Sequence, residues 1–164
     1  MEISVQIDDP RWEESLGDGL SQCVHDCCEL ALSRVPELQG LEQGGLGLTI
    51  LLADDARVQE LNAQFRGKDK PTNVLSFPNH ASLESLKESL PDDGYLGDII
   101  LAYETVAGEA QEQGKKLIDH LCHLVVHGSL HLLGYDHMDE GDAEVMESLE
   151  ARILGELSIA NPYE

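Results

Sequence analysis

The spacing of apolar and polar residues along the chain predicts four strands and five helices. Residues 2–7 alternate between polar and apolar side chains, which indicates a half-buried strand. Three more short stretches are dense in aliphatic residues, and longer stretches carry apolar residues every three or four positions, as helices do. The predicted strands are 2–7, 46–52, 74–78 and 95–101, and the predicted helices are 12–34, 55–65, 104–113, 115–133 and 141–157.

Two of the predicted helices carry more detail. Asp54 or Asp55 is suited to cap the second helix, with Val58, Leu61 and Phe65 on its buried face. The helix over 115–133 is apolar on nearly all sides in its second half, which predicts that it is central and buried.

The order of these elements predicts an α+β domain. In it a small, mixed sheet of about four strands packs against about five helices. A length of 164 residues fits one domain, and no repeat, low-complexity tract or linker divides residues 1–164.

One motif in the central helix carries the strongest chemical signal. His127, His131 and His137 follow the spacing His-x3-His-x2-Gly-x2-His, in which the glycine is Gly134. Histidines four apart on a helix lie about 40° apart around its axis and about 6 Å along it, so both rings can reach one ion. A glycine in the left-handed conformation can end the helix and let the chain return a third imidazole. Three nitrogen ligands with an open position are typical of catalytic zinc, so we expect one zinc ion here.

The same spacing occurs in metzincin proteases, with one difference. Those enzymes carry a glutamate as general base directly after the first histidine, where this chain has Gly128. A zinc peptidase is therefore an alternative function, although this chain lacks the general base that such an enzyme uses. His120 and His123 extend the same helix face and are predicted to be packing residues or partners of the ligands, rather than ligands.

The charge balance is strongly acidic but uneven. The formal net charge is −22, from 32 acidic and 10 basic residues, which argues against a non-specific nucleic-acid binder. Arg66, Lys68 and Lys70 nevertheless gather in one loop before the strand at 74–78. A local basic edge can hold a polyanion, and Arg66 is the candidate to stabilise charge on a phosphodiester; an ordinary solvated charge run is the alternative.

The remaining features concern location and thiols. No apolar run is long enough to span a membrane, and the N-terminus lacks the pattern of a signal peptide, so we expect a cytoplasmic protein. Cys23, Cys27, Cys28 and Cys122 follow no disulfide framework and are predicted to be reduced thiols. A second metal site from Cys23, His25 and Cys27 is a minor alternative.

Three blocks of the sequence resemble the bacterial YbeY family. They are Leu61-Asn62 through the segment 65–78, Leu96-Gly97-Asp98-Ile99, and the segment 127–137 with its three histidines. With the order of elements between them, the resemblance covers roughly residues 1–157.

The resemblance implies a specific function and set of site residues. It implies a zinc-dependent endoribonuclease that cleaves single-stranded RNA, matures the 3′ end of 16S rRNA and acts in ribosome quality control. It places the metal ligands on His127, His131 and His137 and a functional arginine on Arg66. Lys68 and Lys70 of the same basic loop are further candidates to bind substrate, from the local gathering of charge. The expected partners are rRNA and the ribosomal small subunit or associated protein factors. A non-catalytic ribosome-assembly factor with structural zinc is a further alternative, in which Cys122 could supply a fourth ligand.

Overall fold

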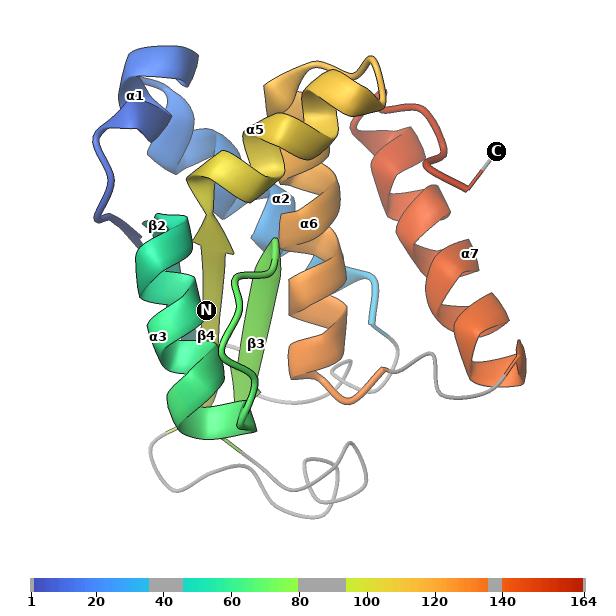
Figure 1. Cartoon of the computed structure of the whole chain (residues 1–164). Coiled ribbons are helices and arrows are strands. Elements are labelled where there is room, and N and C mark those ends of the chain that lie inside the picture. The colour runs from blue at the N-terminus through green and yellow to red at the C-terminus, as the bar shows by residue number, and fades with distance from the viewer. Residues whose placement is uncertain (1, 36–45, 80–93, 136–139, 164) are drawn as a thin grey trace.

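The computed structural model describes residues 2–35, 46–79, 94–135 and 140–163 (Figure 1). The strands are β1 (Glu2–Ile7), β2 (Gly47–Ala53), β3 (Val74–Pro78) and β4 (Tyr95–Ala102). The helices are α1 (Arg11–Leu16), α2 (Leu20–Ser33), α3 (Asp55–Arg66), α5 (Tyr103–Glu112), α6 (Leu117–Leu132) and α7 (Glu140–Glu156). All four strands therefore form where the sequence predicts them, to within one residue.

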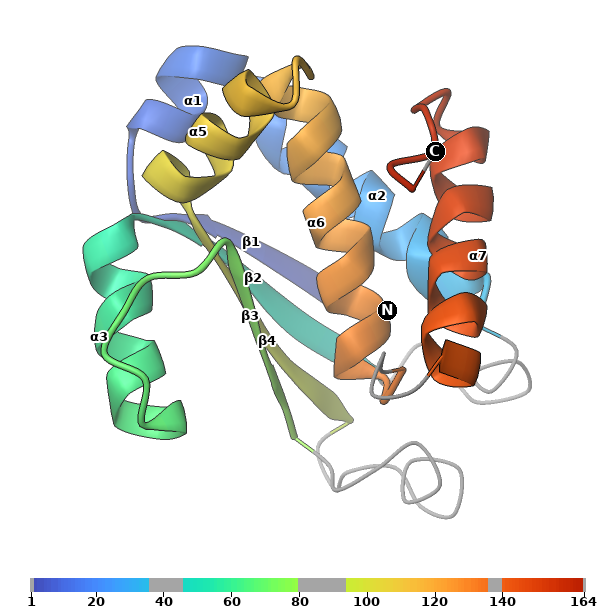
Figure 2. The same cartoon turned by 45° about the vertical axis from the view of Figure 1, so that its right-hand side comes forward.

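The strands form one mixed sheet in the order β1-β2-β4-β3. β1, β2 and β4 run parallel, and β3 pairs antiparallel with β4, so β3 is an edge strand. Helices α2 and α6 cover one face of the sheet, α3 covers the other, and α7 packs on the outer side of α6 (Figure 2). The predicted α+β class with a small mixed sheet is confirmed.

Helix α6 is the central helix that its composition predicts. It lies between the sheet and α7, and most of its side chains are buried. Among the described residues, no helix combines the length and apolar character needed to cross a membrane.

Two details of the predicted helices are wrong. The single helix expected over 12–34 is two helices, because Gly17-Asp18-Gly19 interrupts it and Gly17 adopts a φ of 87° that favours glycine. Phe65, expected on the buried face of α3, is 62% exposed. It belongs to the last turn of α3, where its ring meets that of Phe77 edge-on at 5.6 Å instead of entering the core.

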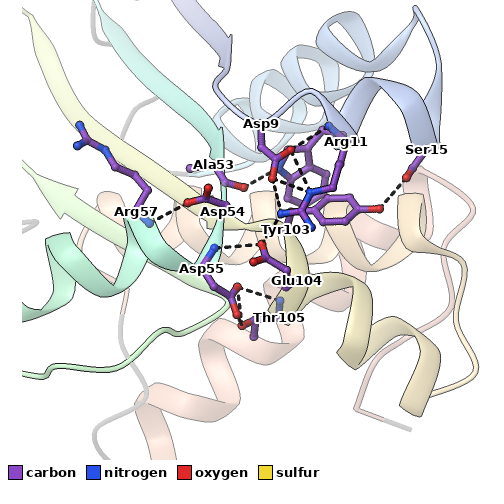
Figure 3. Close-up of polar contacts among 11 residues, drawn as sticks. Asp9, Arg11, Ser15, Ala53, Asp54, Asp55, Arg57, Tyr103, Glu104 and Thr105 are labelled. Atoms are coloured by element: carbon purple, nitrogen blue, oxygen red, sulfur yellow. Dashed lines mark hydrogen bonds and ion pairs between the residues drawn. The ribbon is translucent and has the colours of Figure 1, made fainter.

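A polar network fastens α3 and α5 to each other at the carboxyl ends of β2 and β4 (Figure 3). The Asp55 carboxylate at the start of α3 accepts hydrogen bonds from the backbone N–H and the hydroxyl of Thr105 in α5. In return, the Glu104 carboxylate of α5 accepts one from the backbone N–H of Asp55. Each helix therefore supplies an acceptor for the unpaired N–H groups at the start of the other.

The same network ties α1 to this end of the sheet. The Arg11 guanidinium binds the Asp9 carboxylate at 2.7 Å and the Glu104 carboxylate at 2.8 Å, and it lies over the Tyr103 ring (Figure 3). Beside it, the buried Trp12 indole donates to the carbonyl of Ala53. The Arg11 side chain lowers the pKa of Asp9 by hydrogen bonding.

Candidate metal centre and basic loop

Four histidines follow one side of α6. They are spaced so that each ring neighbours the next, with ring centroids 6.0, 6.2 and 4.4 Å apart along the series His120, His123, His127 and His131. The shortest separation joins His127 and His131, the pair that the motif predicts to share an ion. Helix α6 ends directly after them, and Gly134 adopts the left-handed φ of 101° expected for the turn that follows.

The third predicted ligand, His137, lies outside the described residues, as does Asp136 beside it. The structure therefore places His127 and His131 together, and the position of His137 relative to them stays a prediction.

Glu150 of α7 is a residue of this centre that the motif does not contain. Its side chain is fully buried, and one carboxylate oxygen contacts Nδ1 of His127. The other oxygen accepts a hydrogen bond from the Tyr163 hydroxyl and lies 3.7 Å from Nε2 of His123. Burial alone would raise the pKa of Glu150, but the nearby His123 ring and the contacts with His127 and Tyr163 outweigh it and lower the pKa to about 2. Glu150 is therefore a buried carboxylate that holds His127 in one orientation.

The sequence contains a signal for Glu150 that spacing analysis can find. Met146, Glu150, Ile153 and Leu154 are the buried residues of α7, so the glutamate lies on the apolar face of that helix. Because a buried carboxylate requires partners, a glutamate at such a position predicts a histidine or cation opposite it.

The donor set around Glu150 can hold a metal ion. Atoms of His123, His127 and Glu150 that could ligate an ion all lie within 4.8 Å of one another. Within the described parts of the chain, neither ring nitrogen of the part-buried His123 has a hydrogen-bond partner. Imidazole and carboxylate are both ligands of zinc, so these residues fit a metal centre.

His120 belongs to a different contact. Its Nε2 lies 2.9 Å from the Glu109 carboxylate of α5, which also accepts a hydrogen bond from the Asn73 amide. Burial lowers the pKa of His120. This chain of contacts ties α6 to α5 and to the residue before β3.

The packing around Gly128 explains why no glutamate follows His127. A Cβ atom at this position would lie 2.9 Å from a methyl group of Ile99 and 3.3 Å from both the Ser76 hydroxyl and a Val74 methyl group. α6 therefore packs against β3 and β4 through Gly128, and the position has no room for a longer side chain. The packing argues against the general base of a peptidase at this position.

The basic loop is joined to the histidine helix through Ser76 of β3. The Arg66 guanidinium donates to the Ser76 carbonyl at 2.9 Å, and the Ser76 hydroxyl donates to the Gly128 carbonyl at 3.0 Å. Arg66, Lys68 and Lys70 are all exposed. Arg66 also lies over the Phe77 ring, with its Cζ atom 5.6 Å from the ring centroid.

The loop after Arg66 has a defined shape. Gly67 ends α3 in the left-handed conformation, with a φ of 67°, and the backbone N–H groups of Gly67 and Lys68 both reach the Asn62 carbonyl. The buried Asn62 amide then donates to the Lys70 carbonyl at 2.8 Å. These bonds fix the backbone that carries the three cations.

The fold and this centre define a class of protein: a mixed-sheet α+β protein whose central helix presents a histidine-rich, metal-capable site beside a basic loop. The family profile described as "Endoribonuclease YbeY" matches residues 6–158. Proteins named Endoribonuclease YbeY from Paramagnetospirillum magneticum and Jannaschia sp. are 50% and 44% identical to the chain. Each comparison covers 99% of this chain, with 96% of the first relative and 100% of the second.

A solved structure has the same fold. The solution structure of TM1509 from Thermotoga maritima, described as VT1, superposes with a TM-score of 0.56 at 25% identity. The comparison covers 95% of this chain and 91% of that chain. The chain belongs to the endoribonuclease YbeY family, as the sequence resemblance predicts.

Proposed function

We propose that this chain is a zinc-dependent endoribonuclease that cleaves single-stranded RNA, and that residues 1–164 form one metal-dependent hydrolase domain. Family membership supports the hydrolysis of RNA. The single structural observation that carries the proposal is the connection of the histidine centre to Arg66 through Ser76 and Gly128. Strand β3 thereby contacts both the helix that carries the histidines and the arginine suited to a phosphodiester.

We infer that one zinc ion binds His127, His131 and His137, with Glu150 outside the ligand shell. Because Nδ1 of His127 contacts Glu150, the ion would bind the opposite ring nitrogen, Nε2. Glu150 is fully buried, so an ion ligated by it would lack the open side that an RNA substrate requires. A carboxylate behind a ligating histidine instead fixes the ring and raises its basicity.

Bound zinc and the basic residues of this chain would have different roles in RNA cleavage. Bound zinc supplies a Lewis acid that polarises a phosphate oxygen and acidifies water. Arg66 is the group that would neutralise negative charge developing on the phosphate, because its planar fork suits two phosphate oxygens. Lys68 and Lys70 would attract the flanking backbone of the RNA.

Phe65 suggests how unpaired bases are held. The exposed Phe65 ring, the Phe77 ring and the Arg66 guanidinium form one surface patch at the end of α3. Aromatic rings and guanidinium planes stack on single-stranded bases irrespective of their identity, whereas paired bases are not accessible to them. This patch supports a preference for single-stranded RNA.

We infer that the substrate is the 3′ end of 16S rRNA and that the small ribosomal subunit or a bound protein presents it in the cytoplasm. A body with a net charge of −22 repels naked RNA, so a short basic loop would bind it weakly. Cleavage of the same rRNA end is therefore expected to be faster on pre-ribosomal particles than on naked RNA at physiological salt. Equal rates would contradict presentation by the ribosome while leaving the nuclease assignment intact.

The assignment of the site itself is tested by cleavage of single-stranded RNA by the full chain. We expect Arg66→Ala to lower the cleavage rate about 100–1,000-fold, the loss typical when one group that stabilises transition-state charge is removed. His131→Ala is expected to lose at least as much activity together with bound zinc, measured by elemental analysis. Arg57→Ala on the same helix and His25→Ala on α2 are matched controls that should cleave normally. Normal cleavage by Arg66→Ala and His131→Ala would place the activity elsewhere.

A further inference from the structure

Three cysteine side chains meet between α2 and α6, away from the histidine centre. Cys23 and Cys27 lie one turn apart on α2, and Cys122 lies on the face of α6 that packs against them. Their three sulfur atoms are all within 4.8 Å of one another, and the sulfurs of Cys27 and Cys122 are 3.1 Å apart. The minor alternative drawn from the sequence, with His25 as a partner of Cys23 and Cys27, thus differs from the arrangement found.

The arrangement of this thiol cluster differs from that of an ordinary buried cysteine. Cys27 and Cys122 are nearly fully buried, whereas Cys23 is part-exposed and gives the cluster a side toward solvent. Cys28, the neighbouring buried cysteine, has another role: its sulfur accepts a hydrogen bond from the Ser129 hydroxyl, and burial raises its pKa to about 12. The chain therefore contains three converging thiols and one isolated thiol in the same helix pair.

We propose that Cys23, Cys27 and Cys122 form a second metal site, which binds one soft, thiophilic cation such as Cu(I) through three sulfur atoms. Sulfurs about 2.3 Å from a shared ion in a trigonal plane lie about 4 Å apart, which the present spacing reaches with small side-chain rotations. Among the described residues, the group that could hold an ion here contains these three thiols and no fourth ligand. Soft thiolate ligands suit both Cu(I) and zinc, but structural zinc normally takes four ligands, so a set of three thiolates favours Cu(I).

Binding would replace thiol protons by the ion. Each of Cys23, Cys27 and Cys122 must give up its thiol proton to bind the ion as a thiolate. As each sulfur binds the cation, its displaced proton passes to solvent on the Cys23 side. No electron is transferred, and the bound ion links α2 to α6.

The test is a competition for Cu(I) between the reduced full chain and a chromophoric Cu(I) chelator, without oxygen. Wild type is expected to retain one Cu(I) per chain, with sulfur ligands visible by X-ray absorption. Loss of an outer-shell partner alone weakens metal sites by about 10–100-fold, so Cys23→Ser and Cys122→Ser should each weaken retention by at least about 100-fold. Cys23→Ser is the variant least able to disturb the core, since that side chain is part-exposed.

The matched control is Cys28→Ser, which removes a thiol from the same helix pair and should retain Cu(I) as wild type does. Equal retention by Cys23→Ser and wild type would overturn the proposal. So would equal loss in Cys28→Ser, or a reduced wild-type chain that retains no ion. Because cleavage of RNA is not the measurement, failure here leaves the proposed nuclease function untouched.

Discussion

At the scale of single residues, the candidate metal centre depends on side chains outside the predicted ligand set. Glu150 contacts His127 from behind and is in turn bound by Tyr163, so the orientation of a predicted ligand is set by α7 and the segment after it. The three-histidine motif predicts the ligands, but it contains no information on what holds them.

Replacing Glu150 by glutamine tests this positioning role. The amide keeps the size of the side chain but loses the negative charge that favours a proton on Nδ1 of His127. Zinc affinity, measured by competition with a zinc chelator, is expected to fall about 10–100-fold, with a parallel loss of cleavage at limiting zinc. Tyr163→Phe should have a smaller effect in the same direction. Unchanged zinc affinity in Glu150→Gln would show that the carboxylate serves only packing.

Gly128 offers a second test at this scale. Gly128→Ala should lower the free energy of unfolding by about 1–3 kcal/mol, because the added methyl group meets Ile99 at 2.9 Å and forces the helix away from the sheet. Gly108→Ala in α5 is the matched control, since nothing lies within 4 Å of its added methyl group. It should instead be neutral or stabilising by up to about 1 kcal/mol, through helix propensity. Urea unfolding of both variants measures the difference, and equal effects would contradict the close packing.

At the scale of elements, local pattern predicts the helices and strands well and their contacts poorly. The apolar character of α6 indicates that it is central, and alternation predicts β1. Which residues of distant helices meet depends on packing that spacing does not encode, as the contact between Cys27 and Cys122 shows. Phe65 fails for a related reason: periodicity gives it an apolar position, but its ring meets that of Phe77 on the edge strand and stays largely exposed.

The ion pair that fastens α1 gives a prediction about pH. The pKa of Asp9 is lower in the folded chain than its ordinary value of 3.8, so the pair with Arg11 stabilises the fold above that pH and the contribution fades as pH falls further. Arg11→Gln should therefore be less stable than wild type near neutral pH, and the difference should shrink below about pH 3. Urea unfolding at both pH values measures this, with Arg57→Gln as the control. A difference that persists in acid would assign the effect to packing over Tyr103 instead.

The reciprocal hydrogen bonds of the Asp55 and Glu104 carboxylates make the starts of α3 and α5 depend on each other. Asp55→Ala removes the acceptor for Thr105 at the start of α5, and we expect a loss of about 1–2 kcal/mol in the free energy of unfolding. Hydrogen exchange should locate the loosening in the first turn of α5, although the substitution is in α3. Loosening confined to α3 would contradict the cross-connection.

At the scale of the whole molecule, a strongly acidic protein carries its proposed substrate contacts on one loop. The acidic composition alone argues against a nucleic-acid ligand. The loop from Arg66 to Lys70 is a local exception, because it is basic and has a defined shape. Charge distribution could be predicted from the sequence, but the bonds from Asn62 that fix the loop could not.

The salt dependence of RNA binding measures how many phosphates this loop contacts. For single strands the slope of log K against log salt is about −0.7 per neutralised phosphate, so Lys68→Ala with Lys70→Ala should make the slope shallower by about 1.4. Arg57→Ala with Arg152→Ala removes the same charge from other exposed positions and should leave the slope unchanged. Equal changes in both double variants would indicate that net charge, and not the loop, governs binding.

The packing of Gly128 also bears on how such enzymes can diverge. A single base change converts two of the four glycine codons to glutamate, so from those codons a peptidase-like sequence lies one mutation away in genetic terms. In physical terms it is more distant, because the substitution collides with Ile99 before any new chemistry could be selected. The neighbouring strand would first need a smaller side chain. The protein with that change alone would carry a cavity and gain no function. The order in which mutations can accumulate thus separates two enzyme classes that share one spacing of histidines.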